Sequence, residues 1–162
     1  MRNIGAVSTG DELRQAMRRF PVGVAVATVE IERTRLGLTL SSLVSLALEP
    51  PLVGISVAHQ AAFHELLREA GGFAVSLLAG DQLALAQHFA RGVPPIAMWE
   101  GVDARPGGRG PLLEGAVGWL ECGLDGELDA GDHTFFVGRV ERAEAGLEKP
   151  PLLRLGGEYR PA

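Results

Sequence analysis

LGLTLSSLVSLALEPP, residues 36–51, places hydroxyl side chains at every second position of an aliphatic run: Thr39, Ser41 and Ser45 are in phase. A β-strand points successive side chains to opposite faces, so this alternation predicts one polar face and one core face. Ser42 falls out of phase, which indicates a bend or bulge. The prolines at 50 and 51 end the strand, since proline has no N–H to donate to a ladder.

Two interpretations of this stretch are open from its periodicity alone. It is either a half-buried strand whose serines face water, or a row of hydroxyls and backbone amides that lines a flat ligand. The rest of the chain has to decide between them.

Composition limits the kinds of partner that this chain can have. With 162 residues, 46% hydrophobic and 22% charged, it is long enough for one globular domain, 1–162, in which we expect residues 1–8 to be flexible. The net charge of −5 argues against nucleic acid or an anionic membrane and favours small molecules. A single cysteine and the lack of a long apolar run predict a cytoplasmic protein without a membrane span.

Hydrophobic periodicity and turn residues predict mainly β structure with inserted helices. We expect the first helix to be capped by Thr9, with Glu12 completing a capping box, and the third to be capped by Asp81. The helices are expected at 9–20, 63–70 and 82–89, and the strands at 22–31, 36–49, 52–58, 73–78, 112–128, 133–145 and 152–159. Short turns join most of them and 91–110 is expected to be a long loop, so an antiparallel barrel of six or seven strands is favoured over a parallel sheet.

The run GDHTFFVG, residues 131–138, begins a strand with a histidine beside a carboxylate. At the mouth of a strand, His133 can offer a donor to a ligand, tuned by Asp132. The alternative is a histidine that merely satisfies the end of the sheet.

These runs carry a resemblance that covers the chain from about Leu13 to Tyr159. The blocks LRQAMRRFPVGVAVAT, LTLSSLVSLALEPPLVGISV, FAVSLLAGDQLALAQHFA, GPLLEGAVGWLEC, GDHTFFVGRV and PLLRLGGEYR together resemble the flavin reductase family of the FMN-binding split barrel. The resemblance implies a homodimeric, Greek-key split β-barrel. It also implies an NAD(P)H:flavin oxidoreductase that passes hydride from NADH or NADPH to FMN or FAD and supplies a partner flavin-dependent monooxygenase.

The resemblance also implies where flavin binds. The block 39–42 is expected to run along the isoalloxazine edge, where fixed donors stabilise the charge that develops on hydride arrival. His133 is expected to be catalytic as an orienting donor, not as an obligatory acid. The implied flavin-binding residues are Thr39, Leu40, Ser41, Ser42, Ser56, Val57, Ala58, His59, Gln60, Phe63, Arg91 and His133.

The chain departs from the family at the expected phosphate site. The usual Ser/Thr pair is absent from the segment His59–Gln60–Ala61–Ala62–Phe63, so we expect backbone amides of the following helix, with His59 or Gln60, and Arg91 to hold the anion. A metal site is not expected, because His59 and His64 would not share a helix face. The missing hydroxyls keep two alternatives open: a flavin-binding or electron-transfer module without NAD(P)H oxidation, and a barrel that has lost its cofactor.

Overall fold

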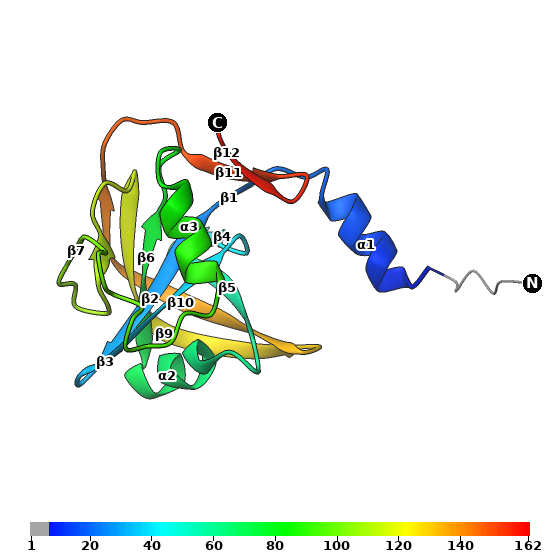
Figure 1. The fold of residues 1–162 in the computed structure, drawn as a ribbon. Helices are drawn as coiled ribbons and strands as arrows, with labels where there is room; N and C mark the ends of the chain where they lie inside the picture. The colour runs from blue at the N-terminus through cyan, green and yellow to red at the C-terminus, as the bar shows by residue number, and fades with distance from the viewer. Residues whose placement is uncertain (1–6) are drawn as a thin grey trace, which may run out of the picture.

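The computed structural model describes residues 7–162 and shows a curled antiparallel sheet with helices around it (Figure 1). Most of the predicted flexible N-terminus, residues 1–6, lies outside the described residues. The elements in chain order are α1 Thr9–Met17, β1 Val22–Gly23, β2 Ala25–Ile31, β3 Thr34–Leu40, β4 Val44–Leu48, β5 Pro51–Ala58, α2 Ala62–Ala70, β6 Gly72–Leu77, α3 Leu83–Ala90, β7 Ala104–Arg105, β8 Leu112–Leu113, β9 Gly118–Ala130, β10 His133–Ala145, β11 Leu152–Leu155 and β12 Glu158–Pro161.

Seven strands form the main sheet in the order β3-β2-β6-β9-β10-β5-β4, and every pairing is antiparallel. β3 and β4 follow each other in the chain, yet they lie at opposite edges. In a flat sheet they would be about 29 Å apart, whereas the link from Leu40 to Val44 can span at most about 15 Å. The sheet must therefore curl until its edges approach, which makes a barrel split between β3 and β4.

The predicted strand 36–49 is thus two strands, and this part of the prediction was wrong. The bend expected at Ser42 is confirmed, but it is a complete break at residues 41–43 that carries the chain from one edge of the sheet to the other. The physical reason is that an alternating pattern fixes which face a side chain occupies, but not which neighbour the strand pairs with.

Three other predicted strands also divide. The strand expected at 22–31 breaks into β1 and β2, and the one at 112–128 into β8 and β9. The strand expected at 152–159 is the hairpin β11–β12, which turns at Gly156 and Gly157, both at positive φ (66° and 85°). Strand β1 pairs with the β11–β12 hairpin in a separate sheet, β1-β11-β12, whereas β2 belongs to the main sheet. The residues expected to form one strand at 22–31 therefore contribute to two sheets.

The N-cap of helix α1 lies one residue earlier than expected, and the helix ends at Met17, before the expected residue 20. Ser8, not Thr9, is the N-cap, and its Oγ accepts a hydrogen bond from Asp11 N at 3.2 Å. Ser8 Oγ also donates to the Asp11 carboxylate at 2.8 Å, so Asp11 takes the place expected for Glu12. The described residues leave the apolar side chains of α1 open: Leu13 is 61% and Met17 52% exposed. Figure 1 shows α1 standing away from the barrel.

The other two helices lie against the barrel. In α2, Phe63 and Leu67 are buried, and Gly71 ends the helix at φ 67°. In α3 the predicted cap was wrong, because Asp81 accepts instead from Lys149 Nζ at 2.8 Å, and Gln82 occupies the N-cap. The predicted loop 91–110 is confirmed apart from the two residues of β7.

Candidate functional site

Ser42 lies where β4 leaves β5. The β4–β5 register pairs Val44 with Gly54, so continuing it places Ser42 opposite Ser56. Ser42 Oγ accepts from Ser56 N at 3.0 Å and donates to Ser56 O at 3.3 Å. The side-chain hydroxyl therefore substitutes for the backbone ladder at the split, and Ser42 can offer a ligand mainly its own backbone groups.

Several predicted flavin-binding side chains already make contacts within the protein and are not free to contact a ligand. Thr39 Oγ1 donates to Ala86 O at 2.7 Å and so ties α3 to β3. Leu40, Val57 and Phe63 are 6%, 1% and 3% exposed, respectively. These three side chains belong to the core, so only their backbone groups could reach a ligand.

Ser41 is the hydroxyl of this stretch that lines a cavity. It lines a cavity of about 420 Å³ between the barrel and α1, together with Met17 from α1, Phe20 shortly after that helix and Arg154 from β11. It also lines an adjoining apolar cavity of about 270 Å³. A concave, mainly apolar hollow of this size with a few polar groups is typical of a small-molecule site.

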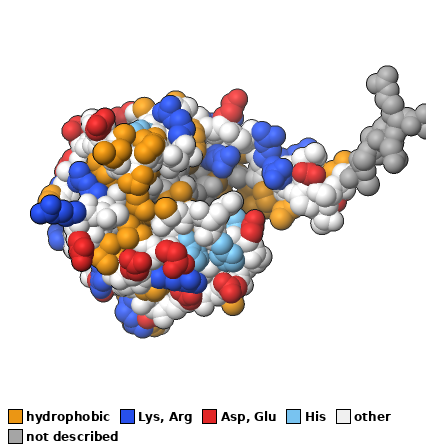
Figure 2. All heavy atoms as spheres, turned by 60° about the horizontal axis from the view of Figure 1, so that its bottom comes forward, with side chains coloured by type: hydrophobic (Ala, Val, Ile, Leu, Met, Phe, Trp, Pro, Cys, Tyr) orange, Lys and Arg blue, Asp and Glu red, His pale blue; other side chains and the backbone are white. Residues whose placement is uncertain are grey.

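The end of β5 lies beside the start of β10. Ala58 pairs with His133 in the antiparallel register, and Ser56 pairs two residues further along β10. The structure therefore brings together the loop after β3, the end of β5 and His133, which the sequence separates widely. Figure 2 shows histidine side chains gathered on one face of the barrel, near the hollow beside α1.

His133 is half-buried and held by its neighbour. Its Nδ1 lies 2.7 Å from Asp132 Oδ1, and this hydrogen bond, with the charge of the imidazole, lowers the pKa of Asp132. Since a carboxylate only accepts, Nδ1 carries the proton. Nε2 then accepts when the ring is neutral and donates when it is charged, so the predicted donor role requires the imidazolium.

The segment before α2 offers backbone groups and one imidazole. His59 N donates to Asp132 O at 3.0 Å, which ties this segment to the β9–β10 turn. The N-cap Ala61 makes no side-chain hydrogen bond, so the first turn of α2 keeps open N–H groups that suit an anion. His59 Nε2 lies 3.6 Å from Asp129 Oδ1, while Gln60 is exposed.

His59 precedes α2, so the helical spacing used for His59 and His64 does not apply to them. Their rings meet edge to face with centroids 5.4 Å apart. In residues 7–162, no group of three or more His, Cys, Asp or Glu side chains is arranged to hold a metal ion.

Arg91 is not brought to the other predicted residues by any contact in the described chain. Its Nε donates to Gln87 O at 3.2 Å, one turn back in α3. A role at the flavin phosphate stays a prediction that the structure of this chain does not support.

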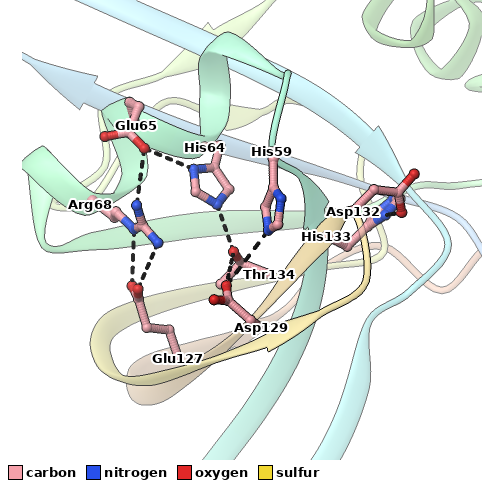
Figure 3. A network of polar contacts seen from close by, with 9 residues as sticks. All are labelled: His59, His64, Glu65, Arg68, Glu127, Asp129, Asp132, His133 and Thr134. Carbon is pink, nitrogen blue, oxygen red and sulfur yellow. Dashed lines mark hydrogen bonds and ion pairs between the residues drawn. The ribbon is translucent and has the colours of Figure 1, made fainter.

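Two buried polar residues were missed by sequence reasoning. His64 on α2 and Thr134 on β10 are 3% and 0% exposed, and His64 Nε2 lies 2.8 Å from Thr134 Oγ1 (Figure 3). Seventy residues separate them, and no spacing rule links a helix residue to a strand residue at that distance.

The fold and this site define a split antiparallel β-barrel in which the Ser41 hydroxyl lines a ligand-sized hollow. A family model described as "Flavin reductase like domain" matches residues 17–162. The reductase component of 4-hydroxyphenylacetate 3-monooxygenase from Thermus thermophilus is 37% identical over 151 residues, which cover 93% of this chain and 95% of that protein. The chain belongs to the flavin reductase family, as the sequence motifs predicted.

Two further comparisons agree with this family. An NADH-dependent FAD reductase from Streptomyces globisporus is 39% identical over 153 residues, covering 92% of this chain and 84% of that protein. The solved structure of an NADH:FAD oxidoreductase from Streptomyces globisporus superposes with a TM-score of 0.90 at 36% identity and covers 98% of this chain and 97% of that one. The predicted split-barrel fold is therefore confirmed.

In the described part of the chain, no helix is long and apolar enough to cross a membrane.

Proposed function

We propose that this protein is an NADH-dependent flavin reductase that passes hydride to FMN or FAD and releases reduced flavin to a separate monooxygenase. The observation that carries the proposal is the match to the flavin reductase family over residues 17–162. The placement of Ser41, the end of β5 and His133 around one edge of the barrel supports it. The expected single domain and cytoplasmic setting stay predictions.

The groups of this chain fit a flavin. Bound flavin supplies the ring that takes hydride from the nicotinamide. The open N–H groups at the start of α2 suit a phosphate, because the helix dipole favours negative charge there. Ser41 can donate from the wall of the hollow, and the core side chains of Leu40 and Val57 hold the flanking backbone rigid.

His133 has a defined task in this proposal. Asp132 fixes the ring and keeps the proton on Nδ1, so the charged ring can donate from Nε2 to an electron-rich oxygen or nitrogen. Fixed donors of this kind stabilise charge that develops during hydride transfer. Hydride transfer needs no proton shuttle, so His133 orients and stabilises the reactants and is not an obligatory acid.

The choice of flavin and nicotinamide is a finer proposal. Relatives carry the names NADH-dependent FAD reductase in Streptomyces globisporus and NADH:FMN oxidoreductase in Rhodococcus qingshengii. One solved relative is described as a complex with NAD and FAD fragments. We infer that NADH is the preferred donor here and that either flavin is accepted.

We also propose that two copies of the chain form a homodimer. Leu13 and Met17 on α1, with Phe20 shortly after the helix, are exposed apolar side chains, and edge strand β4 exposes a second apolar surface, on which Leu48 is 81% exposed. Exposed apolar faces and an open sheet edge of this kind are typically covered by a partner. Sedimentation analysis should give twice the chain mass, and Leu13→Glu should shift the protein towards monomer.

The activity is tested by mixing the purified protein with NADH and either FMN or FAD, and following nicotinamide absorbance. The proposal expects oxidation that depends on added flavin, and no oxidation would contradict it. Flavin binding without NADH oxidation would instead favour the second candidate, a flavin-binding module, which the lack of hydroxyls at 59–63 suggests.

His133→Ala gives a sharper test of the site. It should lower kcat more than it weakens flavin affinity, because the proposed role is in the reaction and not in anchoring flavin. Arg139→Gln is the matched control, since it removes a side chain of the same strand whose contact is to Asp125. A larger effect on affinity than on kcat would remove the role given to His133.

A further inference from the structure

A chain of polar contacts runs beneath the segment that carries His59. Thr134 Oγ1 donates to Asp129 Oδ1 at 3.3 Å, and Asp129 Oδ1 in turn lies 3.6 Å from His59 Nε2. His64 contacts the same hydroxyl at 2.8 Å and also packs against the ring of His59. His59 is thus contacted directly by the buried His64, and by the buried Thr134 through the carboxylate of Asp129 (Figure 3).

The surroundings of His64 decide where its protons are. Its Nδ1 lies 3.1 Å from Glu65 Oε1, and a carboxylate only accepts, so Nδ1 carries a proton. Glu65 is itself paired with Arg68, at 3.1 Å. Beyond it Arg68 pairs with Glu127 on β9 at 2.7 Å, so the carboxylate facing His64 is held in place. The apolar ring of Phe136 closes the remaining side.

The Thr134 hydroxyl has one proton for two acceptors. When His64 is neutral, its Nε2 has a lone pair and competes with Asp129 for that proton. When His64 is charged, Nε2 donates, and the Thr134 proton goes to Asp129. The contact between Asp129 and His59 therefore depends on whether the Thr134 hydroxyl donates to Asp129 or to His64. Thr134 and His64 are both buried, so no ligand reaches them.

We propose that His64 and Thr134 are a positioning pair for His59 in the flavin site of this reductase. The pair fixes the His59 imidazole through ring contact and through Asp129, and so acts on flavin affinity and not on hydride transfer. The inference rests on the proposed function, because it takes His59 as a flavin contact. It adds two buried polar residues to the site predicted from the sequence.

Thr134→Val tests the pair because it keeps the shape of the side chain and removes the hydroxyl. Flavin Kd should rise about three- to tenfold, and kcat at saturating flavin should stay within about twofold, as expected for the loss of one hydrogen bond in a positioning role. Thr134→Ser restores the hydroxyl and should return Kd to within about twofold of the native value.

Thr28→Val is the matched control. Thr28 is also fully buried, and its hydroxyl donates to Pro111 O at 2.7 Å on another part of the barrel. It should lower the unfolding temperature and leave flavin Kd unchanged. An unchanged Kd in Thr134→Val, or an equal rise in both variants, overturns the positioning role.

A cycle with His59→Ala separates this inference from the proposed function. If His59→Ala leaves flavin Kd unchanged, His59 is no flavin contact. That result contradicts both this inference and the proposed role of His59 in binding flavin. If His59→Ala raises Kd, Thr134→Val should add little in the His59→Ala background, because the pair acts through His59. Fully additive effects overturn the inference and leave the proposed function standing.

Nitrogen-15 NMR of the imidazoles gives a readout independent of activity. With His64→Gln to assign the signal, neutral His64 should hold its proton on Nδ1. Its Nε2 resonance should change in Thr134→Val and not in Thr28→Val. A proton on Nε2 of neutral His64 would overturn the hydrogen-bond directions on which the pair depends.

Discussion

Ser42→Ala is the substitution that most directly tests how the barrel is split. The Ser42 hydroxyl makes both hydrogen bonds to the Ser56 backbone where β4 has already left β5. The variant leaves Ser56 N–H without its acceptor in a half-buried position, so water can replace the bond only in part. The expected cost is about 1–2 kcal/mol, in the lower part of the range for an unsatisfied backbone group.

For a chain of this length, such a loss lowers the unfolding temperature by about 2–8 °C. Ser41→Ala is the matched control, because the Ser41 hydroxyl faces the cavity beside α1 and no hydrogen bond in residues 7–162 engages it. It should change stability by less than about 0.5 kcal/mol but weaken flavin binding. The assays are thermal unfolding followed by circular dichroism and flavin titration followed by fluorescence.

Two results would refute this reasoning. If Ser42→Ala unfolds at the native temperature, the hydroxyl does not substitute for the ladder at the split. If Ser41→Ala loses as much stability as Ser42→Ala, the division between a structural and a ligand-facing serine is wrong.

Three more predictions concern packing and titration. A Cβ at Gly138 would lie 2.6 Å from a buried aromatic carbon of β6, so Gly138→Ala should cost about 1–3 kcal/mol in urea unfolding, whereas Gly126→Ala, with nothing within 4 Å, should be nearly neutral. Burial raises the pKa of the Cys122 thiol from 9.0 to about 12, so a thiol reagent should label the protein at neutral pH only after unfolding, and the stabilisation by the buried thiol should be lost as pH rises from 9.0 towards about 12. The hydrogen bond from Arg109 lowers the pKa of Glu141, so Arg109→Gln should return that pKa towards its ordinary value in an NMR titration, and the stability advantage of the native protein should disappear as pH falls through the lowered pKa.

The local sequence predicted most of the elements and the family. β10 begins and ends where the pattern of GDHTFFVG and its continuation predicts, and Gly71 ends α2 because glycine adopts positive φ without strain. Those features depend on neighbours in the chain. Caps were less secure: Ser8 and Thr9 are both good caps, and which of them begins α1 depends on the side chain three residues further on.

Only the tertiary structure decided what the hydroxyls do. The sequence sets Ser42 apart only by its phase and does not distinguish Thr39 from Ser41, yet Thr39 ties down α3, Ser41 lines a hollow and Ser42 closes the ladder at the split.

The pairing of His64 with Thr134 is of the same kind, since it joins a helix and a strand that are adjacent only after the sheet has curled. Periodicity fixes the face on which a side chain lies. The partner across that face is set by which edges of the sheet meet, and that is a property of the closed barrel as a whole.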